Sequence, residues 1–321
     1  MLGVDRVLVA LEQNAGAVYV LEKAITLAAA ADASLEVIHV VYESLADLPV
    51  QAVEKNQMLK TFILQAAESW LEDQLDSARH TLQSKTTAQP AAAADPQKGL
   101  RAIESATIWN KDEWQGIIHA AELGQADLII KAADHPHQTG LAMHTPSDFN
   151  LLRHATVPVM LVKPRAWVKN PIIMAAVDAL NEEQFELGKL VLQEADSLTS
   201  ILNGELAVVS TYPLLQPWAG TESIGIDFEQ LEHDIEKVAR KNLNQLTSAA
   251  NVSYNYLYIE EGRPAMRLRK LAEDTQAEIL VMGTVGRTGV KSLVIGNTSE
   301  TIVQYSHCDV VVVRCSQGSQ A

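Results

Sequence analysis

The chain has 321 residues, which at roughly 150 residues per domain predicts two domains. Hydrophobic residues make up 47% of the chain and charged residues 20%, a composition that excludes wholesale disorder. The 40 acidic and 25 basic residues give a formal net charge of −15, which argues against nucleic acid and anionic membranes as partners.

The first half of the chain alternates short apolar runs with helical patterns. After a strand-like run over residues 7–12, the residues Leu21, Ala24, Ile25 and Ala28 recur at the spacing of one helix face. Further strands are predicted over residues 35–41, 101–108, 127–132 and 157–162, and further helices over residues 52–82 and 113–123. A stretch with four consecutive alanines between two prolines, residues 85–99, is predicted to be a surface loop.

The second half repeats this order of elements. A strand-like run over residues 172–178 is followed by a helical stripe of Leu187, Leu190, Val191 and Glu194, which Ala195 and Leu198 extend. Further strands are predicted over residues 206–211, 254–259, 278–283 and 310–313, and further helices over residues 227–250 and 264–274.

Two copies of one strand–helix series therefore account for the length of the chain. Apolar strands that alternate with helices through short connections are typical of a parallel sheet covered by helices on both faces. We predict an α/β fold of two tandem domains, each an open twisted sheet of five parallel strands. The polar segment 163–171, which contains two prolines, separates the halves, so the predicted domains are residues 1–165 and 166–321.

The cysteines and the absence of targeting signals indicate a cytoplasmic protein. Cys308 and Cys315 form neither a disulfide framework nor a Cys-x-x-Cys site. The first residues lead directly into a strand without the features of a secretory signal. No apolar run approaches the ~20 residues that cross a bilayer, so we expect no membrane association.

A glycine-rich loop follows the fourth strand of the second half. Its glycines, Gly283, Gly286 and Gly296, have the spacing Gly-x2-Gly-x9-Gly, and Asn297 and Thr298 follow at the start of a helical pattern. Glycines allow close approach of the backbone to a ligand, and a helix N-terminus offers free amide donors to a phosphate. The spacing matches neither the Walker A motif nor the Gly-x-Gly-x-x-Gly dinucleotide motif.

This loop, placed after the fourth strand of a five-stranded repeat, resembles the universal stress protein family. The segments 145–153 and 283–289 are similar to those of its tandem, E-type subclass. The resemblance implies that the loop holds the phosphates and ribose of ATP and that Asp178, after the first strand of the half, contacts the adenosine portion. Ser210 lies near the position of an adenine-contacting valine, and Arg287 and Lys291 would add positive charge. The candidate ligand-binding residues are Asp178, Ser210, Gly283, Thr284, Gly286, Arg287, Gly296, Asn297 and Thr298.

The sequence departs from the family pattern at two of these positions. Asn297 stands where the family commonly has serine; its longer amide side chain can still donate to a phosphate oxygen. Ser210 stands where the family has valine.

The first half lacks the glycine loop. Lys131 stands at the position of the first glycine, Asp134 roughly at that of the second, and Thr145 at that of the third. A carboxylate close to a phosphate costs on the order of a few kcal/mol at protein-like dielectric, so we expect no ATP binding of the family kind here. The nearby His135, His137 and His144 allow a metal-site hypothesis, but without cysteines or clustered carboxylates a polar loop explains them, and we assign no metal site.

No catalytic constellation is recognised in the sequence. There is no Gly-x-Ser-x-Gly motif, and His307 and Cys308 are neighbours in a strand lead-in, where adjacent side chains point to opposite faces. We therefore predict a non-enzymatic stress-response protein that binds a small ligand, ATP or another nucleotide, in its second half. Two alternatives stay open: an interaction or scaffold protein, or sensor of a non-nucleotide and even apolar ligand, and a slow ATP hydrolase.

The last strand of each half is strongly apolar, and an uncovered strand of this kind needs a partner. Resemblance to the family implies pairing of these strands across a dimer interface. In a tandem chain the two halves satisfy that pairing within one molecule, so we expect an intramolecular pseudo-dimer and leave a homodimer of the whole chain open.

Overall fold

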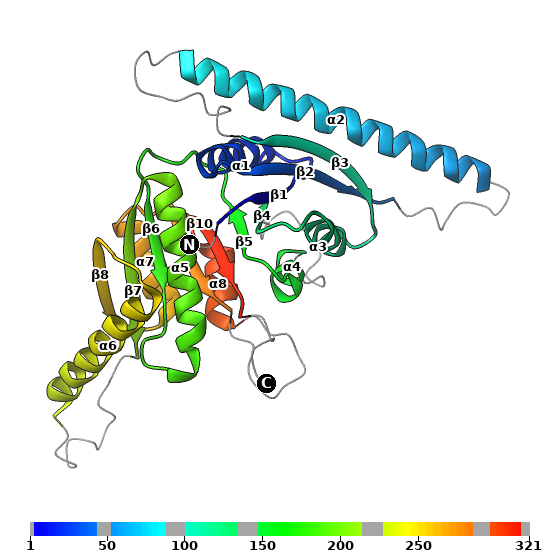
Figure 1. The fold of residues 1–321 in the computed structure, drawn as a ribbon. Coiled ribbons are helices and arrows are strands. Elements are labelled where there is room, and N and C mark those ends of the chain that lie inside the picture. The colour runs from blue at the N-terminus through cyan, green and yellow to red at the C-terminus, as the bar shows by residue number, and fades with distance from the viewer. Residues whose placement is uncertain are drawn as a thin grey trace. The chain divides into compact units, whose positions relative to one another are not determined.

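A computed structural model of the chain describes residues 3–43, 53–87, 100–133, 147–213, 227–284 and 296–315. The chain forms two compact units, one over residues 3–167 and the other from Val168 onward (Figure 1). Each unit is described on its own.

The first unit is a five-stranded, fully parallel sheet with four helices in its described part. Along the chain its elements are β1 (Arg6–Ala10), α1 (Ala17–Ala31), β2 (Ser34–Val41), α2 (Val53–Thr87), β3 (Ala102–Trp109), α3 (Glu113–Gly124), β4 (Leu128–Ala132), α4 (Ser147–His154) and β5 (Val159–Val162). The strand order is β3-β2-β1-β4-β5.

The second unit repeats this arrangement. Its elements are β6 (Ile172–Ala176), the short 3-10 helix η2 (Glu182–Gln184), α5 (Phe185–Leu202), β7 (Glu205–Tyr212), α6 (Phe228–Ala250), β8 (Tyr256–Glu261), α7 (Pro264–Asp274), β9 (Ile279–Gly283), α8 (Asn297–Tyr305) and β10 (Asp309–Val313). All pairings are parallel and the strand order is β8-β7-β6-β9-β10. The predicted fold class, two tandem five-stranded parallel α/β domains, is confirmed.

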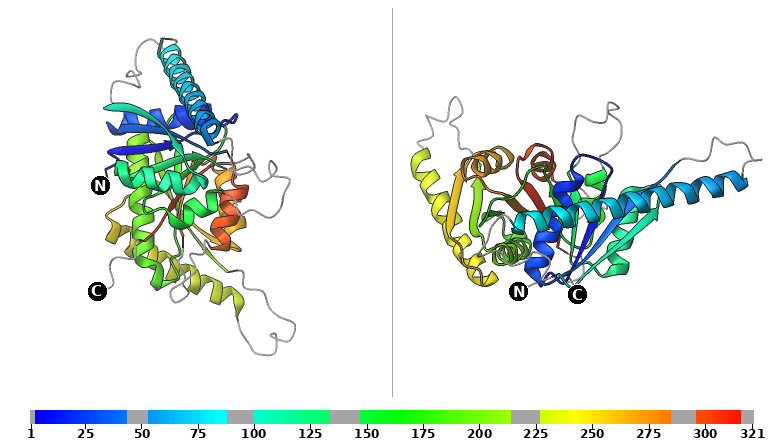
Figure 2. Two further views of the ribbon diagram at one scale, coloured as in Figure 1. Left: turned by 90° about the vertical axis from the view of Figure 1, so that its right-hand side faces the viewer. Right: turned by 90° about the horizontal axis from the view of Figure 1, so that it is seen from above.

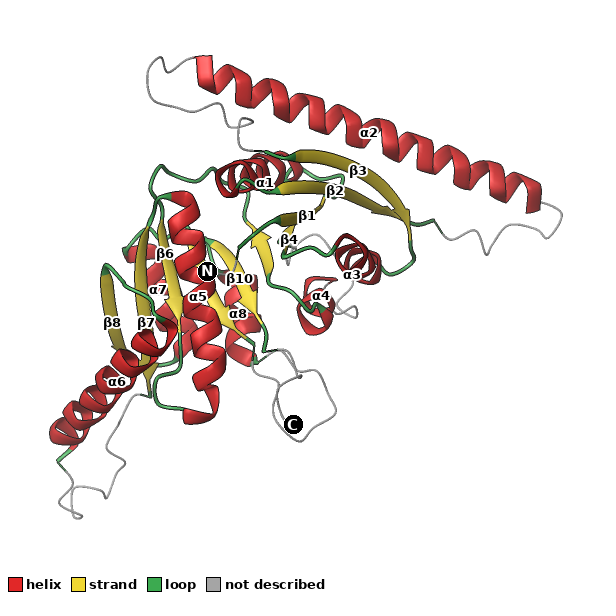
Figure 3. Ribbon diagram, in the orientation of Figure 1, coloured by secondary structure: helices red, strands yellow, loops and turns green. Residues whose placement is uncertain are grey.

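Helices cover both faces of each sheet, as the contacts between elements show (Figure 3). In the first unit α1 and α2 cover one face of the sheet, and α3 and α4 cover the other. In the second unit α5 and α6 cover one face, and α7 and α8 cover the other. Every residue of β4 and of β10 is buried, which explains why these strands read as continuous apolar runs. In the described residues no helix is long and apolar enough to cross a membrane.

The predicted helical stripes face the sheets. In α1, Leu21, Ala24, Ile25 and Ala28 are all buried. In α5 the stripe is buried from Val191 onward, whereas the first two positions, near the helix N-terminus, stay half-buried. That partial exposure belongs to a cavity described below.

Helix α2 is longer than predicted. It continues to Thr87 because no glycine or proline interrupts it before Pro90. Its middle packs on the sheet through Leu71 and Leu75, while its N-terminal end projects past the strands of this unit (Figures 1 and 2). Most of the loop predicted over residues 85–99 lies outside the described residues.

The strand order places one crossover point in each sheet. From the central strand, β1 or β6, the chain moves first to one side and later to the other, so the crossover lies between β1 and β4 and between β6 and β9. The carboxyl ends of parallel strands share one edge, and ligands of open α/β sheets bind outside that edge at the crossover. The topology therefore selects two places for a site, one per unit.

Candidate functional site

The second unit has a cavity of about 570 Å³ at its crossover point. Its walls come from the ends of β6, β7 and β9 and from the N-terminal turns of three helices, α5, α7 and α8. The lining residues are Ala176, Val177, Asp178, Gln184, Leu187, Gly188, Val191, Val209, Thr211, Pro264, Leu268, Met282, Gly283, Gly296, Asn297, Thr298 and Ser299.

Strand β7 presents Val209 and Thr211 to this cavity, but not Ser210. Side chains of a strand alternate between its two faces, so neighbours of a lining residue point away. The Ser210 hydroxyl instead accepts a hydrogen bond from the amide of Ala179 at 3.2 Å. Ser210 is therefore buried behind the cavity wall, and the two residues beside it are the better candidates for ligand contact.

Asp178 lies in the cavity wall just after β6. Its Oδ1 accepts a hydrogen bond from the amide of Leu180 at 3.2 Å, which turns the chain away from the strand. The same loop is held from α6, where the Asn242 amide donates to the carbonyl of Ala179 at 2.8 Å. Asp178 is thus a carboxylate on a well-fixed loop, suited to accept hydrogen bonds from hydroxyl or amino groups of a ligand.

Gly283, the last residue of β9, is required by close packing. An ideal Cβ at this position would lie 2.6 Å from Cδ2 and 2.7 Å from Cγ of Leu187. Because Leu187 itself lines the cavity, any side chain at position 283 would displace it. The following residue, Thr284, is buried, and its amide donates to the carbonyl of Val313 at 2.9 Å; it is not one of the lining residues.

The N-terminus of α8 forms another part of the cavity wall. Gly296 is its N-cap, in an extended conformation, and no side chain caps the first turn among the described residues. Asn297, Thr298 and Ser299 line the cavity, so backbone amides of this turn lie beside their side chains at the cavity wall. An ideal Cβ on Gly296 would meet no described atom within 4 Å. This glycine leaves open space, unlike Gly283.

Two predicted loop residues, Gly286 and Arg287, lie outside the described residues, as does Lys291. The same holds for Asp134, Thr145 and the candidate metal ligands His135, His137 and His144 of the first half. Within the part of the chain that the structure describes, no group of three or more His, Cys, Asp or Glu residues could hold a metal ion.

Sequence reasoning missed the apolar wall of the cavity. Leu187, Gly188 and Val191 of α5 form much of it together with Pro264 and Leu268 of α7. Their helical spacing is that of ordinary core residues, so no pattern separates them from the core. The half-buried N-terminal turn of α5 is the structural sign that this helix end faces a cavity.

The register between strands corrects one predicted equivalence. Lys131 pairs with the last residue of β1, and Met282 pairs with the last residue of β6. Lys131 is therefore the counterpart of Met282, and Ala132 is the counterpart of Gly283. The prediction that Lys131 stands at the position of Gly283 is wrong by one residue, because the strand pairing and not the spacing of loop residues fixes the equivalence.

The sequence model of the universal stress protein family matches residues 3–163 and 171–314. The chain belongs to the universal stress protein family. The match occurs twice in succession, so this is a tandem universal stress protein, as the repeat predicted.

Relatives of this universal stress protein include E-type members. It is 28% identical to universal stress protein E of Escherichia coli K12 over 67% of this chain and 69% of the relative. It is 26% identical to a universal stress protein E homolog of Haemophilus influenzae, over 67% of this chain and 71% of that protein. The resemblance to the E-type subclass is confirmed.

Solved structures show the same fold over nearly the whole chain. Protein PA1789 of Pseudomonas aeruginosa, described as functionally unknown, aligns with a TM-score of 0.65 at 23% identity, over 98% of this chain and 93% of that one. A universal stress protein of Archaeoglobus fulgidus aligns with a TM-score of 0.60 at 16% identity, over 97% and 98%.

Proposed function

We propose that this universal stress protein is a non-enzymatic stress-response protein that binds a nucleotide, ATP, in the cavity of its second unit. The observation that carries the proposal is the position of the cavity. It lies at the crossover of a parallel sheet, at the carboxyl end of β9 and beside the uncapped N-terminus of α8. Both are features that suit a phosphate chain.

The described residues fit the parts of a nucleotide. The volume, about 570 Å³, falls within the roughly 300–1,000 Å³ of ordinary ligand pockets. Leu187, Val191 and Leu268 supply an apolar wall for a base, and Asp178 supplies an acceptor for hydroxyl or amino hydrogens. The first-turn amides of α8, with the Asn297 and Thr298 side chains, supply donors for phosphate oxygens.

The overall charge makes these local donors important. A net charge of −15 opposes the approach of any anion, so binding must depend on backbone donors and on cations close to the site. Arg287, which lies in the glycine loop of the sequence, is a candidate for such a cation.

The cysteines bear on the location of the protein. Free thiols at both cysteines fit a reducing compartment, and we propose a cytoplasmic location.

Isothermal titration of the full chain with Mg-ATP tests the proposal. We expect one site per chain in the wild-type protein and no measurable binding in Gly283→Asp, which places a carboxylate and a displaced Leu187 in the cavity. Asn244→Asp is the matched control, since it adds the same charge at an exposed position of α6 in the same unit and should bind as the wild type does.

Two results would overturn the proposal. Absence of ATP binding by the wild-type chain would favour the scaffold function, or a ligand of another class, which native mass spectrometry of the purified protein would identify. Equal loss of binding in both variants would show that global charge and not the cavity controls the effect.

A further inference from the structure

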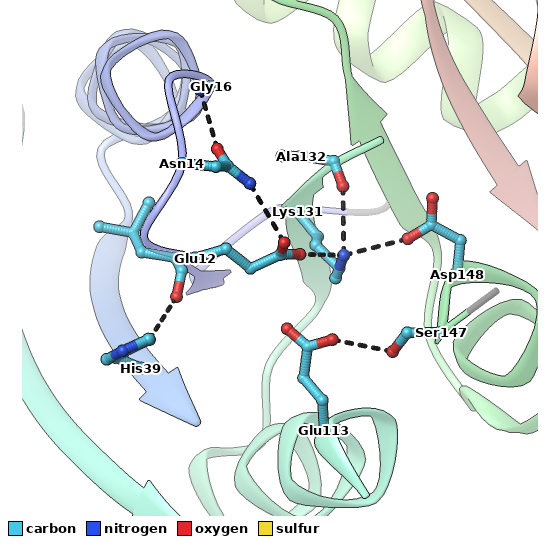
Figure 4. Close-up of polar contacts among 10 residues, drawn as sticks. Glu12, Asn14, Gly16, His39, Glu113, Lys131, Ala132, Ser147 and Asp148 are labelled. Atoms are coloured by element: carbon cyan, nitrogen blue, oxygen red, sulfur yellow. Dashed lines mark hydrogen bonds and ion pairs between the residues drawn. The ribbon is translucent and has the colours of Figure 1, made fainter. Parts of the chain in front are cut away.

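The counterpart of the cavity in the first unit contains a completely buried lysine. Lys131, near the end of β4, has no exposed surface. Its Nζ forms an ion pair with Glu12, lies 3.2 Å from Oδ1 of Asp148, and donates to the carbonyl of Ala132 at 3.3 Å (Figure 4). An ammonium group has three donors, and three oxygen atoms of the described residues lie around this one.

The ion pairs continue into the loop between β1 and α1 (Figure 4). The second carboxylate oxygen of Glu12 accepts a hydrogen bond from the Asn14 amide at 3.1 Å, and Oδ1 of Asn14 accepts one from the amide of Gly16 at 2.8 Å. Gly16 is the N-cap of α1. Lys131 thus connects β4 to the start of α1, which is distant in the sequence.

The other ion pair holds the start of α4. Asp148 is in the first turn of this helix and is only 1% exposed. Beside it, the Ser147 hydroxyl donates to Oε2 of Glu113 at the start of α3, at 2.8 Å. Three elements that surround the crossover of the first sheet, the loop after β1, the end of β4 and the start of α4, are therefore fixed to one ammonium group.

The same positions in the second unit line the cavity. Met282 is the counterpart of Lys131 by register. Asp178 is the counterpart of Glu12, since each follows the last residue of its central strand by two positions. All the second-unit counterparts, Asp178, Met282 and Ser299, are in the cavity wall.

Ser299 is the counterpart of Asp148 by helix alignment. In each final helix one amide closes the last turn, that of Ala155 beyond α4 and that of Ser306 at the end of α8. Asp148 precedes Ala155 by as many positions as Ser299 precedes Ser306, so the two residues occupy equivalent places in their helices. Ser299 is uncharged, and its hydroxyl donates to the carbonyl of Gly283 at 3.4 Å, so no charged group crosses from α8 to the strand at this position.

We infer that Lys131 closes the first-unit site by standing in for a ligand, and that it determines which of the two units is open to one. Its ammonium group makes the connections between β1, β4 and α4 that a bound molecule would make in the second unit. The closure itself stands independently of the proposed ATP binding; only the comparison with a ligand-filled second unit rests on it.

The charges explain why this site excludes an anion. One ammonium faces two carboxylates, so these three charged groups of the described residues carry a net charge of −1, which repels a phosphate. Removing only the lysine would leave two carboxylates close together in a largely buried place. Such a change is strongly destabilising, whereas replacing a buried pair by uncharged groups of similar size is often neutral.

Exchange of the second-unit residues into the first unit provides the test. Lys131→Met should lower the melting temperature of the first unit by on the order of 10 °C, from the known cost of an unpaired buried charge. The double variant Lys131→Met with Asp148→Ser, which copies Met282 and Ser299, should recover at least half of that loss. Lys270→Met is the matched control: its ion pair with Asp274 is exposed, and its loss should leave the melting temperature within about 1 °C.

Hydrogen–deuterium exchange of the full chain separates closure from general stability. In the wild type we expect amides of residues 12–17 and 147–150 to be protected whether or not Mg-ATP is present, and amides of residues 178–184 and 297–300 to gain protection only with Mg-ATP. In the double variant, the first-unit amides should exchange at least tenfold faster despite the recovered melting temperature.

Three outcomes overturn the inference. They are rapid exchange of the first-unit amides in the wild type, unchanged exchange in the double variant, and an Lys131→Met melting temperature equal to that of the Lys270→Met control. Failure of Mg-ATP to protect the second unit would instead overturn the proposed function and leave the first-unit result standing. Because the wild-type measurement needs no variant, the inference stays testable even if a variant fails to fold.

Discussion

Replacement of Gly296 by alanine separates ligand contact from stability. The backbone at Gly296 has φ −67° and ψ 150°, a conformation that alanine adopts readily. An ideal Cβ there meets no described atom within 4 Å. We therefore expect the free energy of unfolding of Gly296→Ala to stay within about 0.5 kcal/mol of the wild-type value.

The added methyl group would nevertheless lie at the rim where the first-turn amides of α8 are to receive a phosphate. Exclusion of a phosphate oxygen from even one of these amides loses a charge-assisted hydrogen bond of about 1.5–3 kcal/mol. A tenfold loss in affinity corresponds to about 1.4 kcal/mol, so the Kd for Mg-ATP should rise by at least that factor.

Gly283→Ala provides the contrasting case. Its Cβ would lie 2.6 Å from Leu187, which must rotate further into the cavity. Overpacking of this kind costs about 1–3 kcal/mol, so this variant should lose both stability and affinity.

Urea denaturation and isothermal titration with Mg-ATP measure both quantities in each variant. Binding of Mg-ATP by Gly296→Ala as tightly as by the wild type would show that the phosphates lie away from α8. Destabilisation of Gly296→Ala by as much as Gly283→Ala would refute the claim of open space at position 296.

Three further predictions concern pH, hydrolysis and thiol chemistry. Burial lowers the pKa of His39 from its ordinary value of 6.5, so the neutral ring stabilises the fold above that pH and the first unit should lose stability as the pH falls below it. His39→Gln should flatten this dependence in thermal unfolding measured between pH 5 and 8. A phosphate-release assay should detect no ATP turnover over hours, and release above background would support a slow hydrolase. A thiol reagent should label exposed Cys315 in the native chain and reach buried Cys308 only after unfolding.

Much of the fold follows from local patterns in the sequence. Continuous apolar runs such as 310–313 are typical of strands buried on both faces, and the stripe of Leu21, Ala24, Ile25 and Ala28 is typical of a helix that packs on the core; all of these residues are buried. Repetition of the same series then fixes two domains of one fold. The glycine spacing, a local property as well, was enough to indicate the family and the unit that carries the candidate site.

The contacts of the site were decided by the tertiary structure. Ser210 could be placed near the ligand by sequence, but the alternation of β7 turns it away and brings Thr211 forward. The apolar wall of Leu187 and Leu268 comes from helices that are distant in the chain and have no distinguishing pattern.

Composition and periodicity determined the elements, their order and the repeat, because these depend on interactions between residues close in sequence. The ion-pair network that fills the first-unit site did not follow from them. By sequence Lys131 stood at the position of Gly283, whereas strand pairing moves it by one position and folding brings Glu12 and Asp148 to its ammonium group. Only the tertiary structure joins these three residues, since a buried charge requires partners and the sequence does not show where those partners will come from.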